Sequence, residues 1–244
     1  MSEKYHEYKS SDPALLLRNP QDDRKLKLYH NLLLKWQQKI NLISNDTIEN
    51  AWQRNFTDSL QLILHLNPAW REAKVQDPVP RILLPQDLCI VDLGSGAGFP
   101  AMVLAVAGYK NVHLIESDSR KCAFLQEVAR VTETSVTIHN KRIEKFFESE
   151  EYEILCSSLR PSQDLVLTSR ACASLDKLFD LIHKKISRET ICLFHKGKNY
   201  SKECEEASKN WEYNMSATPS IAQSESFIVK ISDLKKREYG NQKN

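Results

Sequence analysis

Residues 89–100 have the sequence CIVDLGSGAGFP. A short apolar run ends in an acid, Asp92, and three alternating glycines then precede a helix-like segment. This order predicts a buried strand, a tight turn that lets the backbone approach a ligand, and the start of a helix. A second apolar run ends in Glu116, about 20 residues downstream, a spacing that suits a ribose diol. Together the two runs predict a site for a nucleoside-bearing cofactor at the carboxyl ends of parallel strands.

The glycine pattern differs from the dinucleotide fingerprint G-x-G-x-x-G, in which the helix start faces a pyrophosphate. Here the pattern is G-x-G-x-G, and Phe99 and Pro100 follow it. Asp92 at the strand end would repel a pyrophosphate, whereas a carboxylate suits a sulfonium cofactor. We therefore favour S-adenosylmethionine over a nicotinamide cofactor. A glycine turn without a ligand is the alternative, although three glycines carry a cost in chain entropy.

The composition is that of a globular protein. With 244 residues, 41% of them hydrophobic, the chain can hold one large domain, or one domain with an appendage, around a sizeable core. The net charge of +2 excludes a strongly basic protein but not local basic patches. The six cysteines are scattered without C-x-x-C spacing, which is typical of cytosolic thiols and not of a disulfide framework or a zinc site.

Membrane and metal binding are not expected from this sequence. It contains no apolar run of about 18 residues, the length from which a transmembrane helix is predicted. Its first residues lack the pattern of a signal peptide. The histidines have no metal-ligand spacing with acids or cysteines, so we expect them to be structural or surface residues. The prediction is a cytoplasmic protein without a metal.

The chain divides near residue 80. Residues 11–66 are predicted to be helical, and residues 67–87 are rich in proline and predict an irregular connection. A further helix is expected to begin at Asn45 or Asp46 and to extend past Leu60. We therefore expect a helical segment with its linker in residues 1–80 and a second domain in residues 81–244. Apolar residues recur every three or four positions along the first predicted helix face: Leu26, Tyr29, Leu33, Trp36, Ile40 and Ile43.

After the connection, strand and helix patterns alternate. This alternation predicts an α/β fold with parallel strands and crossover helices on both faces of the sheet. Residues 148–163 are less patterned, and the polar tail from residue 235 is expected to fray. Strands are predicted near 88–93, 112–116, 135–139, 164–169, 191–195 and 226–231, and helices near 100–108, 119–130, 174–185 and 200–209.

Seven short motifs extend over most of the chain. They are W-x-x-x-I-N-L from Trp36, R-x-x-x-D-S-L from Arg54, D-L-G-S-G-A-G-F-P from Asp92, K-x-x-F-L from Lys121, R-I-E from Arg142, T-S-R-A from Thr168 with Ser174 and Leu175, and Lys196 with Gly197. In combination, residues 29–60 and 88–197 resemble the small-subunit ribosomal RNA guanine-N7 methyltransferases, also called the RsmG or glucose-inhibited division protein B family. Two features depart from the family: Asn55 stands where members often have histidine, and the segment 148–163 is longer than usual.

The resemblance implies a class I S-adenosylmethionine-dependent methyltransferase that modifies N7 of a guanine in 16S ribosomal RNA. The implied fold is a Rossmann-like, mostly parallel seven-stranded sheet with an N-terminal helical segment. Guanine N7 has a free lone pair and no proton to remove, so no general base is required and no catalytic residue is assigned. The implied acceptor is 16S ribosomal RNA or a precursor of the small ribosomal subunit, and nothing in the sequence requires more than a monomer.

Strand-end position and resemblance together select the candidate cofactor contacts. Arg170, which follows an apolar run, is the sharpest of them, because it could contact the cofactor carboxylate or an RNA phosphate, or position the substrate. For Arg170 a salt bridge is the alternative, for Phe99 a place in the core, and for Glu116 a solvated acid. The candidates are Gly94, Gly96, Gly98, Phe99, Glu116, Ile143, Glu144 and Arg170.

Basic residues suggest where RNA could bind. Residues 184–202 hold six lysines or arginines against one glutamate, and a second cluster starts at Lys141. Such a run is often only a solvated face, so the cue is weak by itself. The candidates for phosphate contact are Lys141, Arg142, Lys196 and Lys198. Asn41, Arg54 and Asp58 could contact RNA or, more simply, join the helical segment to the second domain through hydrogen bonds.

Two other classes of function stay open from the sequence. One is a methyltransferase of similar fold that acts on a small molecule or a protein. The other is an RNA-binding or assembly factor without turnover, which the intact glycine turn and Glu116 disfavour. A Pro-Cys pair, typical of pyrimidine-carbon methylation, does not occur in the sequence, and an Asn/Asp-Pro-Pro-aromatic loop, typical of amine methylation, is replaced by Thr168-Ser169-Arg170-Ala171.

Overall fold

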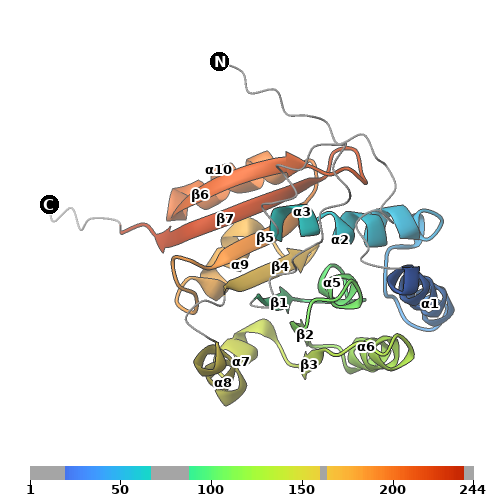
Figure 1. Ribbon diagram of the computed structural model, residues 1–244. Coiled ribbons are helices and arrows are strands. Elements are labelled where there is room, and N and C mark those ends of the chain that lie inside the picture. Colours follow the sequence, from blue (N-terminus) through green and yellow to red (C-terminus); the bar gives the residue numbers. More distant parts are fainter. Residues whose placement is uncertain (1–19, 67–87, 160–163, 239–244) are drawn as a thin grey trace, which may run out of the picture.

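Strand β1 (Cys89–Leu93) lies inside a seven-stranded sheet in the computed structural model, which describes residues 20–66, 88–159 and 164–238 (Figure 1). The strand order is β3-β2-β1-β4-β5-β7-β6. The first five strands in this order are parallel, and β7 and β6 are antiparallel to their neighbours. Their bounds are β2 Asn111–Glu116, β3 Thr137–Asn140, β4 Leu165–Arg170, β5 Ile191–Lys196, β6 Trp211–Pro219 and β7 Phe227–Lys236.

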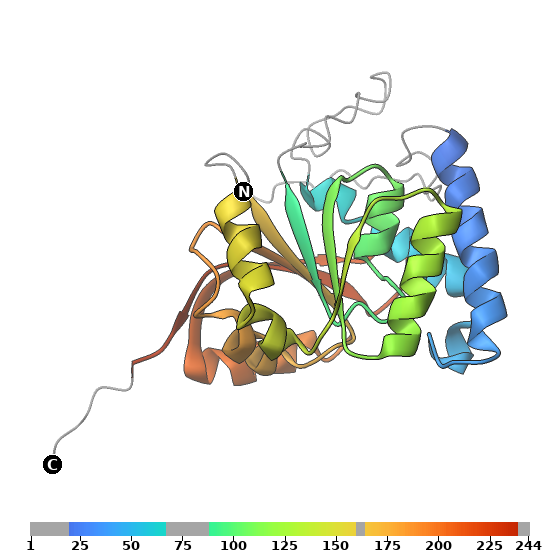
Figure 2. The same cartoon turned by 90° about the horizontal axis from the view of Figure 1, so that it is seen from below.

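Helices cover both faces of this sheet, as the alternation of patterns predicted (Figures 1 and 2). One face packs against α1 (Pro20–Gln37), α5 (Ala101–Val106) and α6 (Ser119–Val131). The other packs against α7 (Ile143–Phe147), α8 (Glu150–Ser158), α9 (Leu175–Ile182) and α10 (Tyr200–Asn210). None of the helices in the described part of the chain combines the length and the apolar character needed to cross a bilayer.

Alternate residues of β1 enter the two cores. Cys89, Val91 and Leu93 lie in the core under α7–α10, whereas Ile90 lies in the core under α1, α5 and α6. Because successive side chains of a strand point to opposite faces, Asp92 shares the face of Ile90. A central parallel strand is buried on both sides, which explains its nearly continuous apolar sequence.

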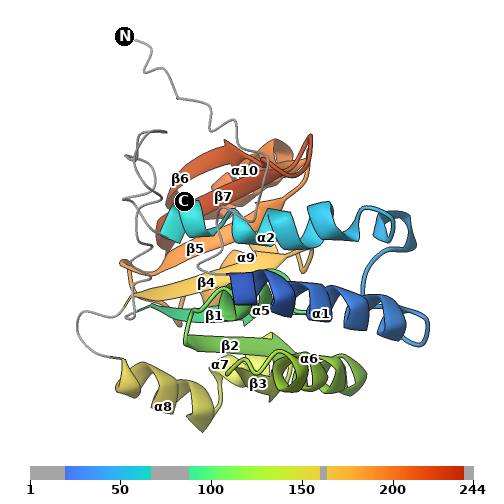
Figure 3. The same ribbon diagram turned by 45° about the vertical axis from the view of Figure 1, so that its right-hand side comes forward.

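The N-terminal helices pack directly on the sheet layer. Helix α1 contacts α5 and α6 and crosses one face of the molecule in Figure 3. Its residues Leu26, Tyr29 and Leu33 are fully buried in the same core as Met102 of α5. A single core therefore contains residues from before and after position 80. The division near residue 80 stays a prediction, because residues 67–87 lie outside the described part.

The predicted first helix face is only partly helical. Helix α1 ends at Gln37, so Ile40 and Ile43 follow it in a turn while still packing on the same core. The side chain of Gln37 holds this turn, because its Oε1 accepts from the backbone N–H groups of Leu42 at 2.9 Å and Ile43 at 3.0 Å. The sequence pattern thus predicted burial correctly and overestimated the length of the helix.

The second predicted helix is broken into short pieces. These are η2 (Asn45–Thr47), the wide π-helical turn η3 (Trp52–Thr57), α2 (Asp58–Leu60) and α3 (Ile63–Leu66). Phe56, Leu60 and Ile63 are buried as their spacing predicts. A π-helical turn inserts one residue and rotates the chain beyond it, and such turns are frequent at functional sites. Residues 11–19, the first part of the stretch predicted to be helical, lie outside the described residues.

Three elements, β6, α8 and the short helix α7, were missed, and one boundary was wrong. Strand β6 forms the outer edge, and the alternation of Trp211, Tyr213, Met215 and Ala217 with polar residues was its signal. Helix α8 lies in the stretch expected to be less patterned, where Tyr152 and Leu155 are buried. The tail begins later than predicted, because β7 pairs with β6 as far as Lys236.

The glycine turn after β1 is in close contact with α1. Gly98 has φ +93°, and a Cβ on it would lie 2.6 Å from the hydroxyl oxygen of Tyr29 and 2.8 Å from Cβ of Met102. The Tyr29 hydroxyl donates to the carbonyl of Ala97, and its ring stacks on Phe99 at 5.5 Å. Glycine is therefore required here both by the backbone conformation and by the approach of Tyr29.

We expect Gly98→Ala to destabilise the fold by about 2 kcal/mol, because a methyl group overpacks this contact and the left-handed backbone strains any other residue. The melting temperature should fall by about 5 °C. Gly197→Ala is the matched control, since a Cβ there meets nothing within 4 Å. Equal melting temperatures for the two variants would contradict the role of Tyr29 in holding the turn.

Candidate functional site

The side chain of Glu116 connects the turns that follow β1 and β2. Its Oε2 accepts from the backbone N–H of Gly96, and its Oε1 from that of Asp118, both at 2.8 Å. The carboxylate is 8% exposed, so it is not the solvated acid that the sequence left as an alternative. Each carboxylate oxygen has a second lone pair, which leaves acceptor capacity toward a ligand.

A first hollow of about 770 Å³ opens beside this carboxylate. Four of the predicted cofactor residues line it together: Gly94 after β1, Glu116 at the end of β2, and Ile143 and Glu144 at the start of α7. The volume lies within the range of ordinary small-molecule sites. The structure therefore brings the strand-end acid Glu116 and the start of the glycine turn to one place, as parallel neighbouring strands require.

Two other predicted cofactor residues lie behind the turn, whereas Gly96 stays beside the hollow through its hydrogen bond to Glu116. Gly98 and Phe99 face the core behind the turn, where Phe99 is 6% exposed and packs on Tyr29 and Phe56. Gly96 has open space where a Cβ would project, because the nearest atom is the carbonyl oxygen of Gly94 at 3.9 Å. Phe99 thus takes the place in the core that the sequence left open as its alternative.

The carboxyl group of Asp92 is fully buried at the end of β1. Thr168 Oγ1 donates to Asp92 Oδ1 at 2.6 Å, whereas Asp92 Oδ2 has no hydrogen-bond partner. Burial raises the pKa of Asp92 from its ordinary value to about 7, opposed by the hydrogen bond from Thr168. A buried, half-satisfied carboxyl directly before the glycine turn fits a cationic group bound nearby.

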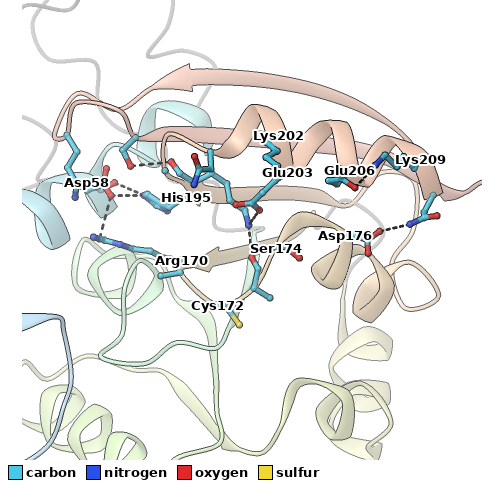
Figure 4. Close-up of a pocket in the computed structure, with 18 residues that line it drawn as sticks. Asp58, Arg170, Cys172, Ser174, Asp176, His195, Lys202, Glu203, Glu206 and Lys209 are labelled. Atoms are coloured by element: carbon cyan, nitrogen blue, oxygen red, sulfur yellow. Dashed lines mark hydrogen bonds and ion pairs between the residues drawn. The ribbon is translucent and has the colours of Figure 1, made fainter.

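A second hollow of about 1030 Å³ adjoins the first (Figure 4). Cys172, Ala173, Asp176 and Asn210 line both of them. The second hollow extends from these shared residues to Arg170, at the end of β4. The two hollows thus lie side by side along the carboxyl ends of β1, β4 and β5.

Arg170 belongs to the second hollow and not to the first. It is paired in register with His195 on β5, and both side chains lie near Asp58 from the N-terminal helices. Arg170 Nη1 is 3.5 Å and His195 Nε2 is 3.6 Å from Asp58 Oδ2. The salt bridge considered as the alternative for Arg170 is therefore present, in a residue that also lines the hollow.

The basic candidates are spread over several places. Lys141 and Arg142 line the first hollow, and Lys141 also pairs with Glu151 at 2.7 Å. Lys196 lines the second hollow, but its ammonium is buried and donates to Glu203 at 2.8 Å and to the carbonyl of Ala173 at 2.6 Å. Lys198 follows β5 as an exposed residue.

The basic run of residues 184–202 does not form one patch. Lys184, Lys185 and Arg188 precede β5, whereas Lys198 and Lys202 follow it. A strand of this length separates its ends by about 16 Å, because each residue rises about 3.3 Å. The basic run is therefore divided between the amino-terminal and the carboxyl-terminal end of β5, and only the group at the carboxyl-terminal end lies near the hollows.

The sequence missed the part that His195 plays in this site. It was expected to be structural or at the surface, but it is 5% exposed, lines the second hollow and donates from Nε2 to the backbone carbonyl of Asp58 at 2.9 Å. Its position at the end of β5, in register with Arg170, was the available signal. No group of three metal-ligating side chains occurs among the residues that the structure describes.

The fold and the paired hollows define a class of protein. A mutant of MtNAS in complex with S-adenosylmethionine, a solved structure, superposes with a TM-score of 0.51 at 14% sequence identity, over 87% of this chain and 76% of that one. At such low identity the likeness concerns the fold alone. The protein has the α/β fold of class I S-adenosylmethionine-dependent methyltransferases, as the sequence predicted.

Sequence comparison identifies the family. The model of the GidB family, rRNA small subunit methyltransferase G, matches residues 22–228. A protein of Paramagnetospirillum magneticum named ribosomal RNA small subunit methyltransferase G is 40% identical over 86% of this chain and 88% of its own. A protein of the same name from Rickettsia bellii is 38% identical over 87% and 94%. The chain belongs to the rRNA small subunit methyltransferase G family.

We expect Glu116→Gln to weaken S-adenosylmethionine binding at least about tenfold, because its amide group must face one of two backbone N–H donors and the charge is lost. Calorimetric titration measures this. Glu127→Gln, which changes an acid paired with Arg130 on α6, is the control and should leave the affinity unchanged. Equal affinities for both variants would remove Glu116 from the site.

Proposed function

We propose that this protein transfers a methyl group from S-adenosylmethionine to N7 of a guanine in 16S ribosomal RNA. The observation that carries the proposal is the pair of adjoining hollows at the carboxyl ends of the parallel strands, in a chain of this family. The first hollow suits the cofactor and the second suits the acceptor base. Their shared wall at Cys172 and Ala173 is where the two ligands would meet.

The residues of the first hollow fit S-adenosylmethionine. Gly94 and Gly96 allow close backbone approach, and the free lone pairs of Glu116 can accept from a ribose diol. Ile143 would cover the adenine, with Glu144 at its edge. Asp92 supplies a negative charge behind the turn, with one oxygen unpartnered. When bound, the cofactor supplies an activated methyl group carried on a sulfonium.

The second hollow meets the requirements for methyl transfer to a ring nitrogen. Guanine N7 offers a lone pair, so the protein has only to align the base and exclude water. Arg170 lines this hollow, and we assign it to the acceptor side, where it positions the base or a neighbouring phosphate. Gly98 and Phe99 contribute indirectly. Gly98 allows the turn to pack on Tyr29, and the ring of Phe99 supports the guanidinium of Arg170.

RNA would reach the hollows past basic side chains at their edges. Lys141 and Arg142 border the first hollow, Lys196 lies in the wall of the second, and Lys198 is exposed after β5. Contacts of this kind bind phosphates without selecting a sequence. We propose that the protein acts as a monomer in the cytoplasm, on 16S ribosomal RNA or a precursor of the small subunit.

The test is transfer of labelled methyl from S-adenosylmethionine to small-subunit RNA from cells lacking this protein. We expect 7-methylguanosine at one site, with transfer that falls steeply as salt rises, because phosphate contacts release counterions. Cofactor binding without RNA labelling, or salt-independent transfer to a small molecule, would contradict the proposed acceptor.

The buried carboxyl of Asp92 predicts a pH dependence of cofactor binding. With its pKa raised by burial to about 7, it is largely protonated at about pH 6 and largely ionised at about pH 8. A carboxylate attracts the sulfonium cation, so affinity for S-adenosylmethionine should rise up to about tenfold between these pH values. S-adenosylhomocysteine, which lacks that charge, should show a smaller rise, and Asp92→Asn should abolish the difference between the two ligands.

The same group has the opposite effect on stability without ligand. Because the native pKa of Asp92 is raised above its unfolded value of 3.8, the native state holds this proton more tightly than the unfolded state does. Its stabilising contribution is present below about pH 4 and is lost as the pH rises through about 7. Stability that is less sensitive to pH in Asp92→Asn than in the unmodified protein would confirm this sign.

A further inference from the structure

Asp58 is a buried carboxylate whose two oxygens have different partners. Its side chain is 1% exposed. Oδ1 accepts from Gln61 Nε2 at 2.5 Å and from Ser220 Oγ at 2.7 Å, and both contacts hold the carboxylate in place. Oδ2 faces the ends of β4 and β5, where Arg170 Nη1 lies at 3.5 Å (Figure 4). One oxygen thus anchors the group and the other faces the acceptor hollow.

Arg170 is the cation that pairs with this second oxygen, Asp58 Oδ2. Burial lowers the pKa of His195, with Asp58 opposing, so the imidazole is neutral near neutral pH. His195 donates its Nε2 proton to the backbone carbonyl of Asp58 at 2.9 Å and stays 3.6 Å from the carboxylate. The negative charge of Asp58 is therefore balanced by the guanidinium and not by the imidazole.

The guanidinium of Arg170 is attracted to Asp58 but not fixed by a hydrogen bond. Nη1 is buried without a hydrogen-bond partner at its 3.5 Å separation. The guanidinium carbon lies 6.0 Å from the ring centroid of Phe99, within the range of a cation–π contact. Asp58 and Phe99 thus hold Arg170 from two sides, while its 19% exposed side chain borders the hollow.

We propose that Asp58 is a positioning residue for the methyl acceptor, which sets the place of Arg170 at the second hollow so that the N-terminal helices complete the acceptor site. The inference rests on the proposed function. The π-helical turn η3, directly before Asp58, directs this residue toward the sheet. The helical segment thereby contributes a charge that the sheet domain does not itself supply to Arg170.

The test is a double-mutant cycle with Asp58→Asn and Arg170→Gln, each of which removes one charge of the pair. Asparagine keeps the shape of the Asp58 side chain. We expect Asp58→Asn to lower kcat/KM for the RNA acceptor at least about tenfold, with less than a twofold change in the affinity for S-adenosylmethionine. The double variant should be no worse than Arg170→Gln alone, because that single variant has already lost the interaction.

Asp92→Asn is the matched comparison, because it changes a second buried aspartate on the same face of the sheet. We expect Asp92→Asn to alter the affinity for S-adenosylmethionine, whereas Asp58→Asn alters kcat/KM for the RNA acceptor. A merely structural Asp58 would lower the melting temperature and the active fraction without changing KM for RNA. Its effect would also add to that of Arg170→Gln, and this additivity would overturn the inference.

A second variant keeps the inference testable if Asp58→Asn does not fold, since removing one partner of a buried pair is costly. Asp58→Glu preserves the charge and moves the carboxylate by one methylene group. We expect reduced transfer that is again not additive with Arg170→Gln, and transfer equal to the unmodified protein would overturn the inference. If the unmodified protein itself labels no small-subunit RNA, the proposed function fails and not the positioning role alone.

Discussion

The close approach of Tyr29 to Gly98 is the contact on which the site depends. A tyrosine from the first helix can reach the turn after β1 only because Gly98 has no side chain. The Tyr29 ring then stacks on Phe99, and Phe99 lies under the guanidinium of Arg170. The packing of one N-terminal helix thus extends through aromatic rings from the turn to the second hollow, so both hollows share one rigid support.

Two buried aspartates, Asp92 and Asp58, place negative charge at different points on this face of the sheet. Asp92 lies before the glycine turn with an unpartnered oxygen, and Asp58 lies opposite Arg170 with its charge balanced. Burying a carboxylate is unfavourable unless a hydrogen bond or a cation compensates it. The guanidinium of Arg170 compensates Asp58, and we propose that the cationic group of the cofactor compensates Asp92.

Local sequence patterns predicted the features that depend on near neighbours. The apolar run before Asp92, the spaced glycines and Glu116 indicated the central strands and the first hollow, because parallel neighbours bring their carboxyl ends together. The patterns failed where burial is incomplete or the backbone irregular. Strand β6 is a half-exposed edge with a weak apolar signal, and the π-helical turn η3 interrupts an apolar periodicity that predicted one continuous helix.

By itself, the sequence determined the α/β class, the family resemblance and the glycine turn with its acid partner. Only the tertiary structure decided that Asp58, Arg170 and His195 meet, because they come from a helix and two strands far apart in the chain. It also divided the basic run into two groups, since β5 carries the chain across the sheet between them. Charges that are close in the sequence need not be close in space, because the path of the backbone decides where each side chain lies.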